Sequence, residues 1–183
     1  MLKRLSTSFL IIVVSLFFAA APAFAANETV TASDGTVIPV LDREEYSRRV
    51  EAFVNDARWQ DEAAWANGEG PKSSPWRAVG CAAYACDFAK EIYGSDKPRT
   101  GISYSGSASQ IQTGDIVHVY YSSGEHWFVV LQRMGDLLYT AEGAYGGKVQ
   151  IETGFYIVSG DTLVARYGTD YEIAEAYHYP ITE

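Results

Sequence analysis

Apolar and polar positions divide this chain into a helical first half and a strand-rich second half. Between residues 42 and 57, apolar side chains recur every three or four positions, which is the period of an amphipathic helix. Asp42, with Glu45 three residues later, is typical of a helix N-terminus with a capping box. We therefore expect a helix that begins after Asp42, packs along one face and ends between residues 58 and 66.

A second helix is predicted over residues 80–94, with a cysteine at its leading end. Apolar residues four positions apart give it a packing face, and Gly94 is a typical left-handed stop. Cys81 would lie in the first turn, where unpaired backbone N–H groups and the helix dipole favour the nucleophilic thiolate. Two alternatives remain: a helix starting at Ser74-Pro75 would place Cys81 in its second turn, and many buried cysteines serve only for packing.

From residue 114 onwards the pattern changes to short β-rich runs separated by glycine turns. The expected strands cover residues 116–121, 126–131, 137–142, 148–152, 155–158 and 172–179, whereas residues 161–167 have the pattern of a short helix. Helices followed by an antiparallel meander predict an α+β domain.

Residues 1–25 have the pattern of a secretion signal. A basic start precedes an apolar run, and Ala23-Phe24-Ala25 is a small-x-small cleavage site. The apolar run is short for a membrane span, although an uncleaved anchor is the alternative. We expect a secreted protein, extracellular or in the cell wall, whose mature chain begins at Ala26.

Charge and length narrow the range of partners. The chain has 14 basic and 23 acidic residues and a net charge of −9, and removal of Lys3 and Arg4 with the signal would bring it near −11. Such a surface repels nucleic acid and anionic lipid heads, so we expect neither as a partner after signal cleavage. The remaining 158 residues suffice for one domain and contain no internal repeat, and we expect a monomer.

The spacing of the two cysteines argues against a disulfide, which an exported protein would otherwise favour. On a helix, Cys81 and Cys86 would point about 140° apart with about 8 Å between them, too far for a bridge. We expect both to be reduced, with Cys86 in the core. A zinc site that combines both cysteines with His118 and His126 fails on the same spacing, so no metal and no cofactor are expected.

The three histidines differ in their context. His126 opens a predicted strand directly after a glycine turn, where its side chain can face a cleft. His118 lies inside a predicted strand and is expected to be packed or at the surface, and His178 has no informative context. His126 is therefore the candidate catalytic base.

Glu142 is the candidate partner of His126. A three-residue loop at Met134–Asp136 would place both side chains on one face of the hairpin, whereas a two-residue loop would turn Glu142 to the other face. We favour the three-residue loop because such loops commonly contain a glycine. Glu142 would then fix the tautomer of His126 and stabilise its imidazolium form, the alternative being a solvated strand end.

The order of these motifs resembles the NlpC-like and CHAP superfamily, the papain-like cysteine amidases and peptidases of bacterial cell walls. The match covers roughly residues 76–151. It rests on the cysteine-led helix, Gly114-Asp115-Ile116-Val117 at a strand start, the histidine strand His126-Trp127-Phe128-Val129-Val130, and Ala141-Glu142-Gly143.

The resemblance implies a papain-like α+β domain over residues 76–183, with a cysteine-led helix packed on an antiparallel β-meander and residues 26–75 as a helical lead-in. It implies Cys81 as nucleophile, His126 as general base and acid, and Glu142 as a further polar site residue. Gly114-Asp115 would be a structural turn. Related domains often carry an asparagine two residues after the glutamate. This chain has Ala144 there, so Glu142 would have to orient His126 alone.

These observations predict a secreted cysteine hydrolase that cleaves an amide bond in peptidoglycan peptides or another peptide substrate. The backbone N–H of Cys81 would contribute one oxyanion contact. The alternative is a non-catalytic module that binds cell wall or glycan, favoured by the aromatic content and by Ala144. The enzyme alone requires a thiol of low pKa paired with a histidine, and this difference separates the two hypotheses.

Overall fold

The structure is a computed structural model that describes residues 28–31, 35, 37–65, 79–94, 102–104, 106–122, 124–166, 170–179 and 181–182. The predicted secretion signal and its cleavage site lie outside the described residues, as does Ser74-Pro75. In the described part of the chain, no helix is both long enough and apolar enough to cross a membrane.

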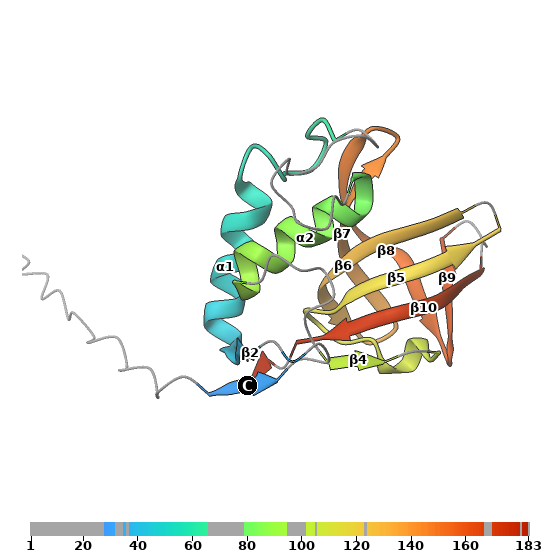
Figure 1. Ribbon diagram of the computed structural model, residues 1–183. Coiled ribbons are helices and arrows are strands. Elements are labelled where there is room, and N and C mark those ends of the chain that lie inside the picture. Colours follow the sequence, from blue (N-terminus) through green and yellow to red (C-terminus); the bar gives the residue numbers. More distant parts are fainter. Residues whose placement is uncertain are drawn as a thin grey trace, which may run out of the picture.

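The described residues contain two α-helices and eleven strands (Figure 1). The helices are α1 (Arg43–Asn55) and α2 (Gly80–Tyr93), and a short 3-10 helix spans Ala108–Gln110. The strands are β1 (Thr29–Thr31), β2 (Val37–Pro39), β3 (Leu41–Asp42), β4 (Ile102–Tyr104), β5 (Ile116–Tyr121), β6 (Gly124–Met134), β7 (Leu137–Tyr145), β8 (Lys148–Ser159), β9 (Thr162–Ala165), β10 (Asp170–His178) and β11 (Ile181–Thr182).

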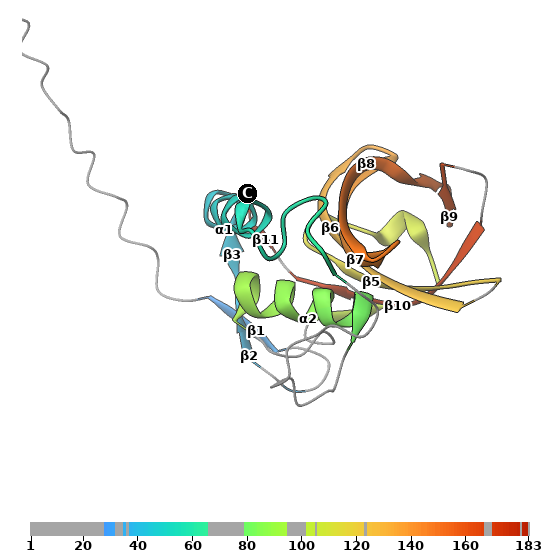
Figure 2. The same ribbon diagram turned by 90° about the horizontal axis from the view of Figure 1, so that it is seen from above.

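Strands β5 to β10 close into an antiparallel barrel. The hydrogen-bonded order is β10-β5-β6-β7-β8-β9, β9 pairs again with β10, and β4 is added beside β10. Seen from above, the strands curve into a ring with α1 and α2 on one side (Figure 2). Apolar side chains fill the interior, among them Val117, Val119, Phe128, Val130, Leu138, Tyr156 and Leu163.

The predicted papain-like α+β fold is therefore wrong. Strands make up most of the regular structure, and a closed six-stranded barrel replaces the expected meander packed on a helix. The predicted helix over residues 161–167 is strand β9, in which Leu163 and Ala165 are buried and Val164 is partly exposed, the alternation of a strand. Four residues are too few for periodicity to distinguish the two structures, and the pairing of β9 with both β8 and β10 is what closes the ring.

The other predicted strands occur close to their expected places. β5 has the expected bounds, and β6, β7 and β10 include the predicted segments or most of them. The two runs predicted at residues 148–152 and 155–158 form the single strand β8, which passes through Gly154 at a φ of 72°. Glycine tolerates this conformation inside a strand. The chain therefore continues through Gly154 as one strand, whereas two separate strands were predicted.

Helix α1 begins as predicted and ends earlier than predicted. The carboxylate of Asp42 accepts a hydrogen bond from the Glu45 backbone N–H at 2.7 Å, which caps the helix. At the other end, Asp56 has an extended backbone and its side chain accepts from the backbone N–H of Arg58. This local turn ends the helix at Asn55, before the predicted range of residues 58–66.

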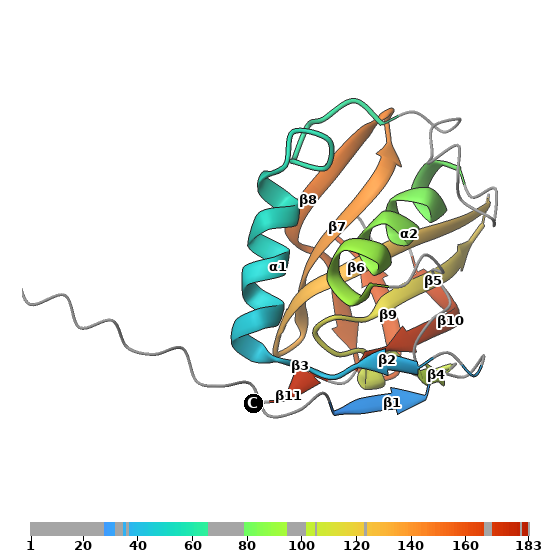
Figure 3. The same ribbon diagram turned by 60° about the vertical axis from the view of Figure 1, so that its left-hand side comes forward.

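Helix α2 confirms the predicted position of Cys81. Val79 is the N-cap residue with an extended backbone, so the helix that carries Cys81 starts at Gly80 and Cys81 lies in its first turn. Gly94 ends it at a φ of 73° and donates its N–H to the carbonyl groups of the last turn. The helix lies over β6 and β7 and beside α1 (Figure 3).

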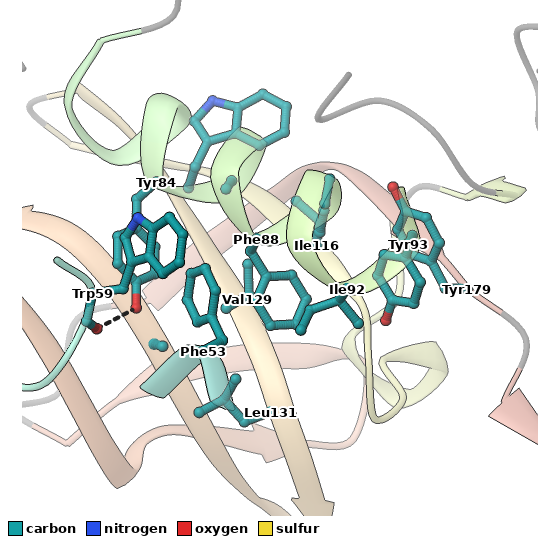
Figure 4. Packing of buried hydrophobic residues seen from close by; sticks show 14 of the residues in the cluster. Phe53, Trp59, Tyr84, Phe88, Ile92, Tyr93, Ile116, Val129, Leu131 and Tyr179 are labelled. Atoms are coloured by element: carbon teal, nitrogen blue, oxygen red, sulfur yellow. Dashed lines mark hydrogen bonds between the residues drawn. The ribbon is translucent and has the colours of Figure 1, made fainter. Parts of the chain in front are cut away.

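One aromatic cluster joins both helices to the outer face of the barrel (Figure 4). Phe53 of α1 stacks on Trp59 at 4.5 Å between ring centroids and meets Phe88 of α2 edge-on at 5.4 Å. Tyr93 stacks on Tyr179 at 3.6 Å. Each fully buried side chain of this size contributes about 1.5–3 kcal/mol to the free energy of unfolding, so the cluster fixes α2 against the sheet.

Candidate active site

Cys81 lies in the first turn of α2 and is partly buried. It forms no disulfide, nor does Cys86, which is buried in the core as predicted. The Cys81 side chain forms a hydrogen bond with His126, and the backbone N–H groups of Ala82 and Trp127 point to its sulfur. The sulfur is therefore surrounded by hydrogen-bond donors, which favour the thiolate.

The β6–β7 hairpin positions the predicted base and its supporting acid. Its turn is the two-residue segment Gly135-Asp136, whereas the sequence predicts a three-residue loop. Gly135 has a φ of 65°, as expected for the first central residue of a tight hairpin turn. In a regular ladder, this shorter turn would place Glu142 on the face opposite to His126.

A β-bulge at Leu131 restores the predicted register. The pairing shifts by one residue there, so Val129 faces Ala141, as the longer loop predicts. The hydroxyl group of Tyr46, on α1, donates to the Leu131 carbonyl oxygen at 3.1 Å. As a result, the predicted base and acid share the interior face of the barrel at one end.

His126 and Glu142 are in direct contact. The Nε2 atom of His126 forms a short hydrogen bond with Oε2 of Glu142. The Glu142 side chain is 1% exposed and that of His126 is 15% exposed, so solvent hardly screens the pair. The prediction that Glu142 supports His126 agrees with this contact, and the alternative of a solvated strand end does not. Because Nε2 is engaged by the carboxylate, Nδ1 is the ring nitrogen left for the thiol.

The pKa of the Cys81 thiol is lowered and that of the His126 imidazole is raised, so each shift favours the charged form of its group. Burial of His126 opposes protonation, but its hydrogen bonds to Cys81 and Glu142 outweigh burial and raise its pKa to about 10. Burial also opposes ionisation of Cys81, yet the hydrogen bond and charge of His126 lower the pKa of the thiol below its usual value. Both shifts favour a thiolate–imidazolium pair at neutral pH.

Tyr156, in the interior of the barrel on β8, is a site residue that the sequence analysis missed. Its hydroxyl group donates to Oε2 of Glu142 at 3.1 Å. The second oxygen of Glu142, Oε1, is buried and has no hydrogen-bond partner among the described residues. Nothing in the sequence distinguishes Tyr156 from the other aromatic residues of the predicted strands, because its contact with the carboxylate depends on how side chains pack inside the barrel.

Ala144 occupies the position at which the resemblance to the CHAP superfamily leads us to expect asparagine. It has a φ of 65°, a left-handed conformation in which asparagine is enriched and alanine is uncommon. The pairing of β7 with β8 shifts between Glu142 and Tyr145, so Ala144 lies in an irregular part of the strand. Its methyl group cannot form a hydrogen bond, which leaves Glu142 as the orienting group.

Gly143 explains how closely α2 approaches β7 beside Glu142. A Cβ atom at this position would lie 2.7 Å from the Trp65 ring and 2.7 Å from Cβ of Tyr84. The indole N–H of Trp65 in turn donates to the carbonyl oxygen of Gly80 at 2.9 Å. A glycine here thus lets the start of α2, and with it Cys81, lie against the strand that carries the acid.

The other two histidines also contact carboxylates but not the thiol. His118 is buried on the outer face of the barrel, where it stacks on Trp127 at 4.4 Å and its Nε2 contacts Glu125 at 3.0 Å. His178 contacts Oδ1 of the fully buried Asp115 through Nδ1 at 2.8 Å. The latter contact ties β10 to the turn before β5, a role that the sequence did not indicate.

Within the described ranges, no three His, Cys, Asp or Glu side chains converge as a metal site would require. A cavity of about 740 Å³ lies between α1 and the β6–β7 hairpin, lined by Tyr46, Val50, Leu131 and Tyr139 among others. Cys81, His126 and Glu142 do not line it, so this cavity is separate from the candidate catalytic residues.

The structure thus brings all three predicted residues together at one end of the barrel, on α2, β6 and β7. In comparisons with known proteins, no family model matches the sequence, and no curated protein matches it either.

Proposed function

We propose that this protein is a cysteine-dependent hydrolase that cleaves an amide bond. The observation that carries the proposal is the continuous contact from the Cys81 thiol to His126 and from His126 to the buried Glu142. A nucleophile, a base and an orienting acid in this order are the groups that covalent acyl transfer requires.

In the proposed reaction, the Cys81 thiolate attacks the carbonyl carbon of the amide, and the carbonyl π electrons move onto oxygen. The backbone N–H of Cys81 donates to that oxygen. Collapse of the tetrahedral intermediate breaks the C–N bond, and His126 gives its proton to the leaving amine. Water then attacks the thioester while neutral His126 accepts its proton. Release of the acid restores the thiolate and the imidazolium.

Glu142 takes no part in these proton transfers. It holds the His126 ring by Nε2 and stabilises the positive charge that the ring carries before attack and after thioester hydrolysis. The low exposure of Glu142 strengthens this interaction, because little solvent screens the two charges.

The proposed substrate is a peptide amide of peptidoglycan. Support comes from the resemblance of the motif order to cell-wall amidases and from the secretion signal predicted over residues 1–25. The mature protein would act outside the cytoplasm and meet its substrate there.

Incubation of residues 26–183 with peptidoglycan from several sources tests the proposal. Mass spectrometry of the soluble fragments should show new amine and carboxylate ends, and Cys81→Ala should release none. Wall binding without cleavage, unchanged by Cys81→Ala, would support the binding module instead. Cleavage that persists in Cys81→Ala would contradict the mechanism.

A further inference from the structure

Two hydrogen bonds converge on one oxygen of Glu142. Oε2 contacts Nε2 of His126 and accepts from the Tyr156 hydroxyl group at 3.1 Å, while the buried Oε1 has no partner within the described part of the chain. The carboxylate is therefore held by the same oxygen that holds the imidazole. Among the described residues, loss of the tyrosine hydroxyl would leave His126 as the one donor to the Glu142 carboxylate.

The interior of the barrel fixes the position of the Tyr156 ring. The ring stacks on Phe128 with 4.2 Å between centroids and an interplanar angle of 12°. Phe155 and Tyr171 meet it edge-on at 4.8 Å and 5.4 Å. Because the side chain is also almost fully buried, this packing holds its hydroxyl group where it reaches Glu142.

Tyr156 stays a donor over the working range of pH. Burial, followed by the charge of Glu142, raises its pKa well above the usual value for tyrosine. In addition to the effect of burial, the charge of Glu142 raises the pKa values of four groups, His126 from β6, Tyr156 from β8, Tyr84 from α2 and Tyr171 from β10. Of the three tyrosines, Tyr156 is the one that forms a hydrogen bond with the carboxylate.

We propose that Tyr156 is a positioning residue of the site, which acts through Glu142 to hold the His126 ring and thereby to activate Cys81. The inference rests on the proposed function, since it names a group that serves the same thiol. It adds a fourth residue to the contact chain, one whose position depends on the closed barrel.

The test measures the alkylation rate of Cys81 by iodoacetamide against pH, which needs no substrate. In the wild-type protein the midpoint should lie below about 8.5, the pKa of an ordinary thiol. Tyr156→Phe should raise the midpoint by about half a unit, because the carboxylate that holds His126 loses a donor, and the effect reaches Cys81 only through Glu142 and His126. Tyr171→Phe is the matched control, because it removes a nearby hydroxyl group that does not bind the carboxylate. It should leave the midpoint unchanged.

A double variant checks that the effect passes through the carboxylate. In a Glu142→Gln background, Tyr156→Phe should change the midpoint far less than it does alone, because the group it acts through is already neutral. Equal effects in both backgrounds would overturn the proposal.

The experiment separates this inference from the proposed function. An ordinary midpoint in the wild-type protein would contradict the activated thiol and so the hydrolase. A low midpoint that Tyr156→Phe leaves unchanged would overturn the role of Tyr156 alone. If circular dichroism shows that Tyr156→Phe does not fold, 3-fluorotyrosine placed at position 156 replaces it. This substitution keeps the ring and changes the strength of the donor, so the midpoint should shift, and an unchanged midpoint would overturn the proposal.

Discussion

Two histidine–glutamate pairs lie on neighbouring strands of this barrel, and they differ in where the carboxylate is. His126 contacts Glu142, whose side chain is 1% exposed, and His118 contacts Glu125, whose side chain is 61% exposed. An ion pair with an exposed carboxylate is weakened by solvent and contributes little, whereas a buried one interacts strongly with its partner.

The two pairs also differ in what faces the other ring nitrogen. The ring of His126 also reaches the Cys81 thiol, while Nδ1 of His118 is buried without a hydrogen-bond partner among the residues that the structure describes, and its ring stacks on Trp127. A histidine next to an acid is thus common to both regions. The presence of a thiol and a buried acid makes the pair on β6 and β7 the catalytic candidate.

Replacing each histidine in turn should give the largest difference in the rate of peptide release between the two pairs. His126→Ala should reduce peptide release by about a thousandfold or more, as should Cys81→Ala, because nucleophile and base act as one unit. The double variant should be hardly slower than either single variant. His118→Ala should remain active. Initial rates of fragment release measure all four, and an inactive but folded His118→Ala protein would show that the outer pair also serves the reaction.

Replacing each glutamate should give a smaller difference in the same direction. Glu142→Gln should slow release by about 10- to 100-fold, because His126 loses the group that orients and charges it. Glu125→Gln is the matched control and should have almost no effect, since its carboxylate lies in solvent. Equal rates for the two variants would remove the distinction drawn between buried and exposed acids.

The same pair of variants should differ in pH dependence. The pKa of His126 is raised to about 10, so the imidazolium that protonates the leaving amine is lost only as the pH rises through that value. Neutralising Glu142 removes one cause of the raised pKa, and the alkaline limb of the rate profile should move to lower pH. In Glu125→Gln this limb should stay in place. A limb that moves in neither variant would contradict the role of Glu142.

Gly143→Ala should separate the thiol from the buried pair without changing any polar group. The new Cβ would lie 2.7 Å from Trp65 and Tyr84, and relief of that overlap should lower the free energy of unfolding by about 1–3 kcal/mol. Release should slow as α2 moves away from β7. Gly124→Ala is the control near the outer pair, where the closest approach is an ordinary 3.4 Å to the Tyr121 hydroxyl. Urea unfolding and release rates compare the two, and equal stabilities would contradict the close packing.

The smallest expected effect comes from Ala144→Gly, beside the buried acid. Ala144 has a φ of 65°, and glycine adopts this conformation without the steric cost that a Cβ atom brings. The free energy of unfolding should rise by about 0.5–1 kcal/mol after the entropy of the added glycine is counted. Release should be unchanged, because the groups that hold the His126 ring are Glu142 and Cys81 and the Ala144 methyl group cannot form a hydrogen bond. A loss of stability in urea unfolding would show that the backbone conformation is not a strain on the fold.

Local sequence patterns were sufficient to predict those parts of the structure that depend on residues close together in the sequence. The cap at Asp42, the start of α2 next to Cys81 and its stop at Gly94 follow from side-chain and backbone groups a few residues apart. The buried position of Cys86 follows from the helix period. Most strands were also found, because alternation and β-branched or aromatic residues mark them locally.

The contact between His126 and Glu142 was predicted correctly, although the turn from which it was predicted is wrong. The hairpin has a two-residue turn and a bulge at Leu131, and these two departures cancel before the register reaches the site. The hydroxyl group of Tyr46 on α1 binds the carbonyl oxygen of the bulge residue, across 85 positions of the chain. A local pattern contains no information about such a partner.

The sequence by itself determined the helix that presents Cys81, the strand that carries His126 and the glutamate within reach of it. Tertiary structure alone decided that the sheet closes into a barrel and that Tyr156 meets the carboxylate. It also decided that Glu142 is buried and not solvated. The physical reason is that helix caps and periods arise from neighbours a few residues apart. Closure, burial and the bulge depend on pairs of strands and side chains that meet only when the whole chain has packed.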